Sequence, residues 1–141
     1  MTQPLLDVKQ LKTEFVTKDG TILAVNDVSL QLKSGEILGL VGESGSGKSV
    51  TGFSLMRLID KPGGVSQGEI LFKGQNLLAL TEKEMRHLRG NRIAMIFQDP
   101  MMTLNPVLRI ETQMIETLRA HEKMSRKEAW QRSCEALALM G

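Results

Sequence analysis

The pattern of apolar and polar positions predicts antiparallel strands in the first quarter of the chain. Residues 5–16 alternate loosely, residues 22–25 form a short apolar run, and residues 28–32 alternate apolar and polar side chains. Such alternation is typical of strands with one face in the core and one face in water. Gly-containing turn signals at 18–21 and 33–36 separate the strands.

Two continuous apolar runs predict strands of another kind. Residues 37–41 (Ile-Leu-Gly-Leu-Val) and residues 92–97 (Arg-Ile-Ala-Met-Ile-Phe) lack alternation, which is typical of strands covered on both faces, as in parallel sheets. We expect a helix over residues 50–58. Further along, residues 61–68 are rich in Gly, Pro and Ser and predict a loop, whereas residues 69–72 predict a strand followed by a turn.

Helical signals dominate the last third of the sequence. Thr81 and Glu84 form a capping-box pattern that predicts a short helix ending near Leu88, and Ser125 and Glu128 repeat that pattern. Residues 110–122 have helical apolar spacing. In the last helix the apolar positions, which we expect to pack inward, are Ala129, Trp130, Cys134, Leu137 and Met140.

Composition narrows the possible functions. The 141 residues are 41% hydrophobic and 24% charged, with a net charge of +2, which suits a single globular domain. The basic residues are dispersed, so we expect no nucleic-acid partner. No apolar run approaches the roughly 20 residues of a transmembrane helix, and a single cysteine fits a reducing compartment. His87 and His121 lack partners at metal-ligand spacing and are expected on solvated helix faces.

Residues 42–49 (Gly-Glu-Ser-Gly-Ser-Gly-Lys-Ser) form a segment with a recognisable chemical function. It matches the phosphate-loop pattern G-x-x-x-x-G-K-[ST] at every fixed position and lies between the expected strand and helix. Glycines allow backbone N–H groups to approach a polyphosphate, and the following helix N-terminus favours an anion. Lys48 would reach the β- and γ-phosphates, and the Ser49 hydroxyl would bind Mg²⁺. The predicted nucleotide-binding residues are Gly42, Glu43, Ser44, Gly45, Ser46, Gly47, Lys48, Ser49 and Val50. This pattern alone leaves kinases, GTPases, helicases and transporter motors open.

A second segment narrows the choice. The run Met-Ile-Phe-Gln-Asp-Pro-Met-Met-Thr-Leu-Asn-Pro at residues 95–106 resembles the Q-loop of ATP-binding cassette (ABC) transporter ATPases, especially those of oligopeptide and dipeptide importers. The resemblance extends over essentially the whole chain. It implies an α/β fold, with a P-loop NTPase core, an N-terminal antiparallel β subdomain and the beginning of a helical subdomain. The implied organisation is 1–97 for the β subdomain and partial core, 98–106 for the Q-loop junction and 107–141 for the helical part.

The resemblance also assigns roles to particular residues. Gln98 would contact Mg²⁺ and the attacking water of a bound ATP, and Phe15 would stack on adenine. For Phe15 a place in the strand core is an equal alternative. Met101 and Met102 either belong to the core or face a membrane subunit, for which flexible methionines are suited. Trp130 is expected to pack within its helix.

Some parts of the family pattern are missing from this sequence. It contains no Leu-Ser-Gly-Gly signature, no apolar strand ending in Asp-Glu, and no switch histidine after such a strand. In the family these elements supply the catalytic base and the partner's half of the composite site. The chain therefore resembles only the N-terminal part of the ATPase domain, and we expect these 141 residues alone to hydrolyse ATP negligibly.

The implied function is that of an ATP-binding subunit, peripheral on the cytoplasmic face of the membrane, that energises the import of peptides or related solutes. The implied cofactors are ATP and Mg²⁺. The implied partners are a second, identical or homologous ATPase subunit and polytopic membrane subunits, which would dock near Gln98 to Asn105. Alternatives are a non-catalytic remnant and a P-loop ATPase without a transport role. The transported solute (dipeptide, oligopeptide, glutathione or nickel) stays open.

Overall fold

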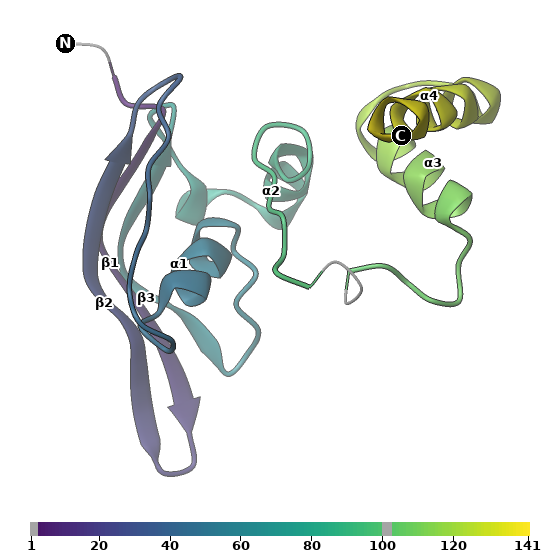
Figure 1. The fold of residues 1–141 in the computed structure, drawn as a ribbon. Helices are drawn as coiled ribbons and strands as arrows, with labels where there is room; N and C mark the ends of the chain where they lie inside the picture. The colour runs from purple at the N-terminus through teal and green to yellow at the C-terminus, as the bar shows by residue number, and fades with distance from the viewer. Residues whose placement is uncertain (1–2, 100–102) are drawn as a thin grey trace. The chain divides into compact units, whose positions relative to one another are not determined.

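The chain divides into two compact units. The computed structural model describes residues 3–99 and 103–141, and the units comprise residues 1–86 and 87–141 (Figure 1). The first unit contains an antiparallel sheet and short helices, and the second is mainly helical. The predicted α/β class is therefore confirmed. In the part of the chain that the structure describes, no helix combines the length and the apolar character needed to cross a membrane.

The sheet of the first unit has four antiparallel strands in the order β2-β1-β3-β4. The predicted strands at 22–25 and 28–32 are joined into one strand, within which Asp27 has a positive φ of 55°. The long β1–β2 hairpin turns over two residues, and the Thr17 hydroxyl donates a 2.7 Å hydrogen bond to the Gly20 carbonyl. The strands are β1 (Leu6–Thr17), β2 (Gly20–Leu32), β3 (Gly63–Phe72) and β4 (Gln75–Asn76).

The loop predicted over residues 61–68 is wrong for most of its length, because β3 begins at Gly63. Strand β1 is long enough to continue the pairing, with Phe15 opposite Gly63. The glycines that suggested a loop allow close approaches within the sheet instead. A Cβ on Gly63 would lie 2.5 Å from the Phe15 ring, and one on Gly68 would lie 2.6 Å from the carbonyl oxygen of Lys9.

Helix α1 (Lys48–Leu55) lies against the sheet, with contacts to β1, β2 and β3 (Figure 1). Its predicted existence is confirmed. The helix ends in a Schellman motif, in which the Leu58 N–H bonds to the Phe53 carbonyl at 2.8 Å and Arg57 adopts a φ of 52°. The Arg57 guanidinium donates to the carbonyls of Leu77 and Leu80, at 3.1 and 2.7 Å. These bonds attach the end of α1 to the short 3₁₀ helix η1 (Leu77–Ala79).

The core of the first unit lies between α1 and the sheet and extends to the elements that follow β4. Helix α2 (Glu82–Leu88) crosses from the first unit into the second, and its predicted capping box is present: the Thr81 N–H donates to Glu84 at 2.7 Å. Among the described residues of this unit, the buried apolar side chains are Val8, Leu11, Val25, Met56, Ile70, Leu77 and Met85.

The two strands predicted for a parallel sheet do not form. Residues 37–41 are coil (Figure 1), and Ile37 and Val41 are 97% and 92% exposed. In residues 92–97, Ile93 makes an isolated bridge to Arg89, and Ile96 is 96% exposed. A parallel strand needs a hydrogen-bonding neighbour, and the four described strands of the sheet pair only with one another and not with either segment. Both segments are apolar, but the burial predicted from their apolar character is wrong.

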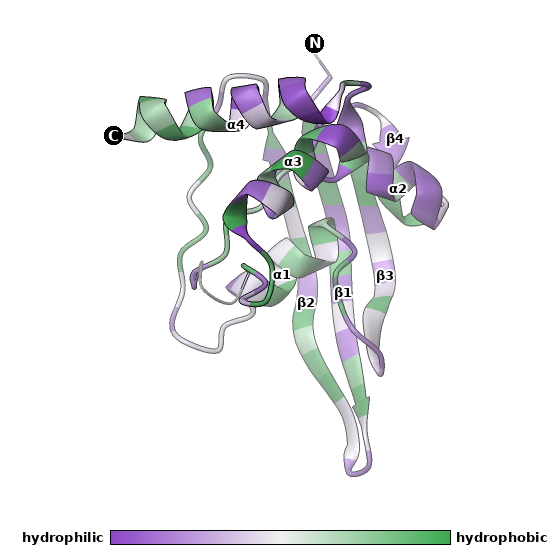
Figure 2. Cartoon of the chain, turned by 90° about the vertical axis from the view of Figure 1, so that its right-hand side faces the viewer, coloured by the Kyte–Doolittle hydropathy of each residue, from purple (hydrophilic) through white to green (hydrophobic). Residues whose placement is uncertain are grey.

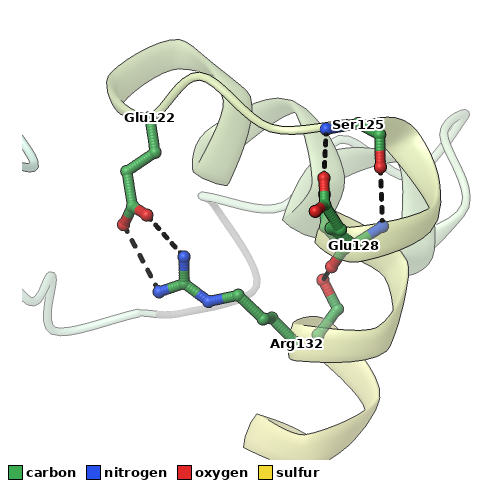
Figure 3. A network of polar contacts seen from close by, with 6 residues as sticks. Glu122, Ser125, Glu128 and Arg132 are labelled. Carbon is green, nitrogen blue, oxygen red and sulfur yellow. Dashed lines mark hydrogen bonds and ion pairs between the residues drawn. The ribbon is translucent and has the colours of Figure 1, made fainter.

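The second unit contains a pair of helices, α3 (Ile110–His121) and α4 (Arg126–Met140), which confirms both predicted helices. Ser125 and Glu128 form the predicted capping box at the start of α4 (Figure 3). Arg132 bridges back with both guanidinium NH groups to the carboxylate of Glu122, as the same figure shows.

The inward-facing positions predicted for α4 are largely wrong. Only Ala129 of that set is buried, together with Ser133 one turn later, whereas Cys134 is exposed and Trp130 is 50% exposed. Small side chains one turn apart permit α3 and α4 to approach, so the narrow contact leaves the larger side chains uncovered. Figure 2 shows the apolar last turns of α4 near the C-terminus, where Leu137 and Met140 are exposed.

The two histidines differ in their surroundings. His87 is exposed, as predicted, but His121 is partly buried, so the prediction of a solvated face is wrong for it. Its Nδ1 atom is buried without a hydrogen-bond partner in the described part of the chain. Its Nε2 atom lies 2.8 Å from the position of a Cβ on Gly90, which has a φ of +78°.

Candidate nucleotide-binding site

The predicted phosphate loop leads directly into α1. Gly47 is the N-cap residue, with φ 88° and ψ 4°, and Lys48 is the first residue of the helix. Gly45 also has a positive φ, of 80°. A left-handed conformation is costly for residues with a Cβ, so the two glycines allow the chain to turn sharply into the helix.

Two glycines of the loop also permit close contacts. A Cβ on Gly47 would lie 2.4 Å from the Ala24 carbonyl oxygen of β2, and one on Gly42 would lie 2.5 Å from Ser46 Oγ. Neither space can accommodate a side chain without movement of its neighbours. The sequence pattern therefore has a steric cause here: glycine at position 47 allows the loop to lie directly on the sheet.

The side chain of Lys48 folds back into the turn that precedes it in the sequence. Its ammonium donates to the carbonyls of Gly42 and Glu43, at 2.8 and 2.6 Å, and lies 3.3 Å from Ser46 Oγ. A backbone bond from Ser46 N–H to the Glu43 carbonyl, 3.2 Å, closes the same turn. The loop thus places a positive charge in the position where the pattern requires a phosphate-binding lysine.

A pocket of about 310 Å³ lies beside this loop. One side, which we call the sheet wall, is Ile22–Ala24 of β2, and the other, the loop wall, is Gly45–Val50. Lys48 is the one charged residue among these lining residues, and the first turn of α1 contains no acidic residue. The unpaired N–H groups and the positive dipole end of α1 therefore favour an anion at the loop wall.

The donors near the loop also fit a phosphate-bound Mg²⁺. Ser49 is exposed and lines the pocket, so its hydroxyl can serve as one oxygen ligand. Mg²⁺ commonly takes one or two protein oxygens and completes its octahedron with phosphates and water. Among the described residues no group of three His, Cys, Asp or Glu side chains could hold a metal by itself, so the fit is to a nucleotide-borne cation.

Comparison with known proteins identifies the family. The sequence model described as "ABC transporter" matches residues 25–141. The chain belongs to the ABC transporter family. In the solved structures, the dimeric ABC transporter cassette MJ0796 superimposes with a TM-score of 0.79 at 25% identity, covering 94% of this chain and 56% of that one. A second structure of the same cassette is described as a post-hydrolysis state bound to ADP and Pi.

Curated members of this ABC transporter family place the chain near peptide transporters. It is 49% identical over 138 residues to the oligopeptide transport ATP-binding protein OppD of Bacillus subtilis, covering 97% of this chain and 38% of that protein. It is also 49% identical over 143 residues to the probable D,D-dipeptide transport ATP-binding protein DdpD of Escherichia coli, covering 99% and 43%. The chain therefore spans about two fifths of the length of these relatives.

The other two residues to which the ABC resemblance gave roles lie outside the pocket lining. Phe15 is half-buried in β1, where it pairs with Ile22 and Gly63, and its ring lies against Gly63. Gln98 occupies an exposed bend of the second unit. Adenine stacking by Phe15 and Mg²⁺ contact by Gln98 stay predictions. Met101 and Met102 lie outside the described residues.

The sequence did not predict that Ile22–Ala24, the sheet wall, would line the pocket beside the phosphate loop. Ile22 and Leu23 look like ordinary strand residues in the sequence, and they are 58% and 43% exposed in the structure. Their proximity to the loop depends on the contact between Gly47 and Ala24, which are far apart in the sequence. No local pattern signals this contact, so the wall becomes visible only in three dimensions.

Proposed function

We propose that this chain is the phosphate-binding part of an ATP-binding subunit that powers an ABC importer of peptides. The observation that carries the proposal is the pocket beside the loop. Among the described residues that line it, Lys48 is the only charged one, and the first turn of α1 contains no acidic side chain. The names of the OppD and DdpD relatives, which refer to oligopeptide and D,D-dipeptide transport, support peptides as the solute class.

Binding of ATP would use the loop wall for the triphosphate. Backbone N–H groups at the start of α1 would donate to phosphate oxygens, and Lys48 would exchange the carbonyls of Gly42 and Glu43 for the β- and γ-phosphates. Ser49 would hold Mg²⁺, which neutralises phosphate charge when bound. The sheet wall would face the nucleoside end of the ligand, where apolar side chains suit a base or sugar.

Hydrolysis and transport belong to the proposed complete domain. There, Gln98 would position Mg²⁺ and the attacking water, and a second ATPase subunit would supply the other half of the composite site. Polytopic membrane subunits would dock near Gln98 to Asn105, with the ATPase peripheral on the cytoplasmic face. The dimeric arrangement described for the MJ0796 cassette supports pairing of two such subunits.

Lys48 is expected to contribute directly to ATP binding. Replacing it with alanine removes the ammonium from the loop, so ATP binding should weaken by at least about tenfold, the loss of one charge-assisted contact of about 1.4 kcal/mol or more. Isothermal titration of the 141-residue chain with ATP and Mg²⁺ measures this directly.

Lys33→Ala is the matched control. Lys33 is exposed in the turn before residue 37. Its backbone N–H donates to the Glu36 carboxylate and its carbonyl accepts from the Glu36 N–H, and alanine retains both of these backbone atoms. This variant should bind ATP within about twofold of the wild type. Equal affinity of the Lys48→Ala and Lys33→Ala variants for ATP would contradict the proposal.

A further inference from the structure

A buried pair of hydroxyl groups joins the sheet to the phosphate-loop helix. Thr13 of β1 and Ser54 of α1 are both fully buried, and their hydroxyl oxygens lie 2.8 Å apart. Ser54 Oγ also donates to the Val50 carbonyl at 2.7 Å. A hydroxyl has a single proton, so Thr13 is the donor to Ser54. The two bonds form a directed chain from β1 through Ser54 to Val50.

Each end of this chain lies beside one wall of the pocket. Thr13 is paired with Val25 of β2, the residue that follows the sheet wall. At the other end, Val50 is the last residue of the loop wall. The pairing of β1 with β2 is irregular on both sides of Thr13, and such irregularities change the direction of a side chain relative to a regular strand.

A second contact joins the same two walls. Ala24 of the sheet wall meets Gly47 of the loop wall through the carbonyl described above, and Val25 lies 3.8 Å from the position of a Gly47 Cβ. The hydrogen bonds of the described residues include none across this contact. The Thr13–Ser54 bond is therefore the directional connection, among the described contacts, between β1 and α1 at the pocket.

We propose that Thr13 and Ser54 are positioning residues that set the spacing between the sheet wall and the loop wall, and so tune the affinity for ligands that touch both. The inference rests on the proposed function. ATP extends from the loop wall, through its phosphates, to the sheet wall, through its nucleoside. Inorganic tripolyphosphate has the same phosphate chain without a nucleoside, so it contacts the loop wall alone. Loss of the Thr13–Ser54 hydrogen bond should therefore weaken the binding of ATP but not the binding of tripolyphosphate.

The test compares the two ligands on the same variants. Thr13→Val and Ser54→Ala remove one hydroxyl each, and Thr13→Ser retains the hydroxyl while losing the methyl group. We expect the first two variants to weaken ATP binding by about tenfold and to bind tripolyphosphate within about twofold of the wild type. Thr13→Ser should retain wild-type affinity for both. Titrations are made with Mg²⁺, below the unfolding temperature of every variant.

Ser133→Ala is the matched control, because Ser133 is also a buried helical serine that donates to the carbonyl four residues earlier, at 2.8 Å from Ala129, but lies in the second unit. It should change neither affinity. Equal weakening of ATP and tripolyphosphate in Thr13→Val would overturn the inference, because the pair would then only support the loop. Unchanged ATP affinity would overturn it too, as would selective loss of ATP binding in Thr13→Ser. A wild-type chain that binds neither ligand would instead reject the proposed function itself.

Discussion

Gly45 and Gly47 have nearly the same backbone conformation but different surroundings. Their φ angles are 80° and 88°, yet nothing lies within 4 Å of a Cβ on Gly45, whereas a Cβ on Gly47 would meet the Ala24 carbonyl. Comparing alanine at the two positions separates the cost of backbone strain from the cost of a lost close approach.

We expect Gly45→Ala to lower the free energy of unfolding by roughly 1–2 kcal/mol, the cost of a left-handed residue with a Cβ. Gly47→Ala should lose a further 1–3 kcal/mol or so, because the loop must move away from β2. Urea unfolding of both variants measures the difference. Equal destabilisation by the two substitutions would show that contact with Ala24 is unimportant.

Prediction from sequence succeeded at residues whose role is local. The phosphate-loop pattern predicts a helix directly after the loop, and α1 does begin there, at Lys48, two residues before the predicted start at residue 50. Sequence prediction failed where the role of a residue depends on a partner that is distant in the sequence. Nothing in the sequence connects Thr13 with Ser54, because burial of two small hydroxyl side chains depends on the pairing of β1 and on the packing of α1.

At the level of elements, both capping boxes give a pH-dependent contribution to helix stability. Hydrogen bonds from Thr81 hold the pKa of Glu84 below its usual value, and hydrogen bonds from Ser125 do the same for Glu128 (Figure 3). A carboxylate with a depressed pKa stabilises the folded state at pH values above its unfolded pKa, about 4.3 for glutamate. The contribution is lost as the pH falls through the lower, folded-state pKa.

We therefore expect the helical circular dichroism of the chain to decrease on acidification below about pH 4.3. Glu84→Gln and Glu128→Gln should reduce that dependence, since glutamine can still complete a capping box but does not titrate. Glu116→Gln, at an exposed position of α3 outside both boxes, is the control. A pH profile that is identical in the Glu128→Gln variant and the wild type would contradict this assignment.

The elements also show where the sequence is insufficient. Capping boxes specify helix starts through contacts within four residues, and both starts were predicted correctly. An apolar run such as residues 37–41 shows that a segment would gain from burial, but it contains no information about which strand will pair with it. The same limit applies to Trp130, whose exposure depends on the width of the contact between α3 and α4.

For the molecule as a whole, exposed apolar segments should dominate its solution behaviour. Ile37 and Val41 are almost fully exposed, and clustered apolar exposure promotes dye binding and association. Replacing both with threonine should reduce the fluorescence of a bound hydrophobic dye, while the free energy of unfolding changes by no more than about 0.5 kcal/mol.

Val8→Thr is the contrasting variant, because Val8 is only 1% exposed and its substitution places an unpaired hydroxyl in the core. It should lower the unfolding free energy by about 1–3 kcal/mol, the cost of a buried polar group without a partner. If the double threonine variant were destabilised as much as Val8→Thr, residues 37–41 would be buried in solution.

The hydrogen bonds of Lys48 to the Gly42 and Glu43 carbonyls have a thermodynamic consequence for ligand entry. These bonds order the turn around a positive charge before any anion binds. The conformational entropy of this segment is therefore lost when the protein folds and not when the ligand binds. In return, an incoming phosphate must compete with two carbonyl oxygens for the same ammonium. Affinity at this site is thus the difference between two sets of contacts to a single side chain.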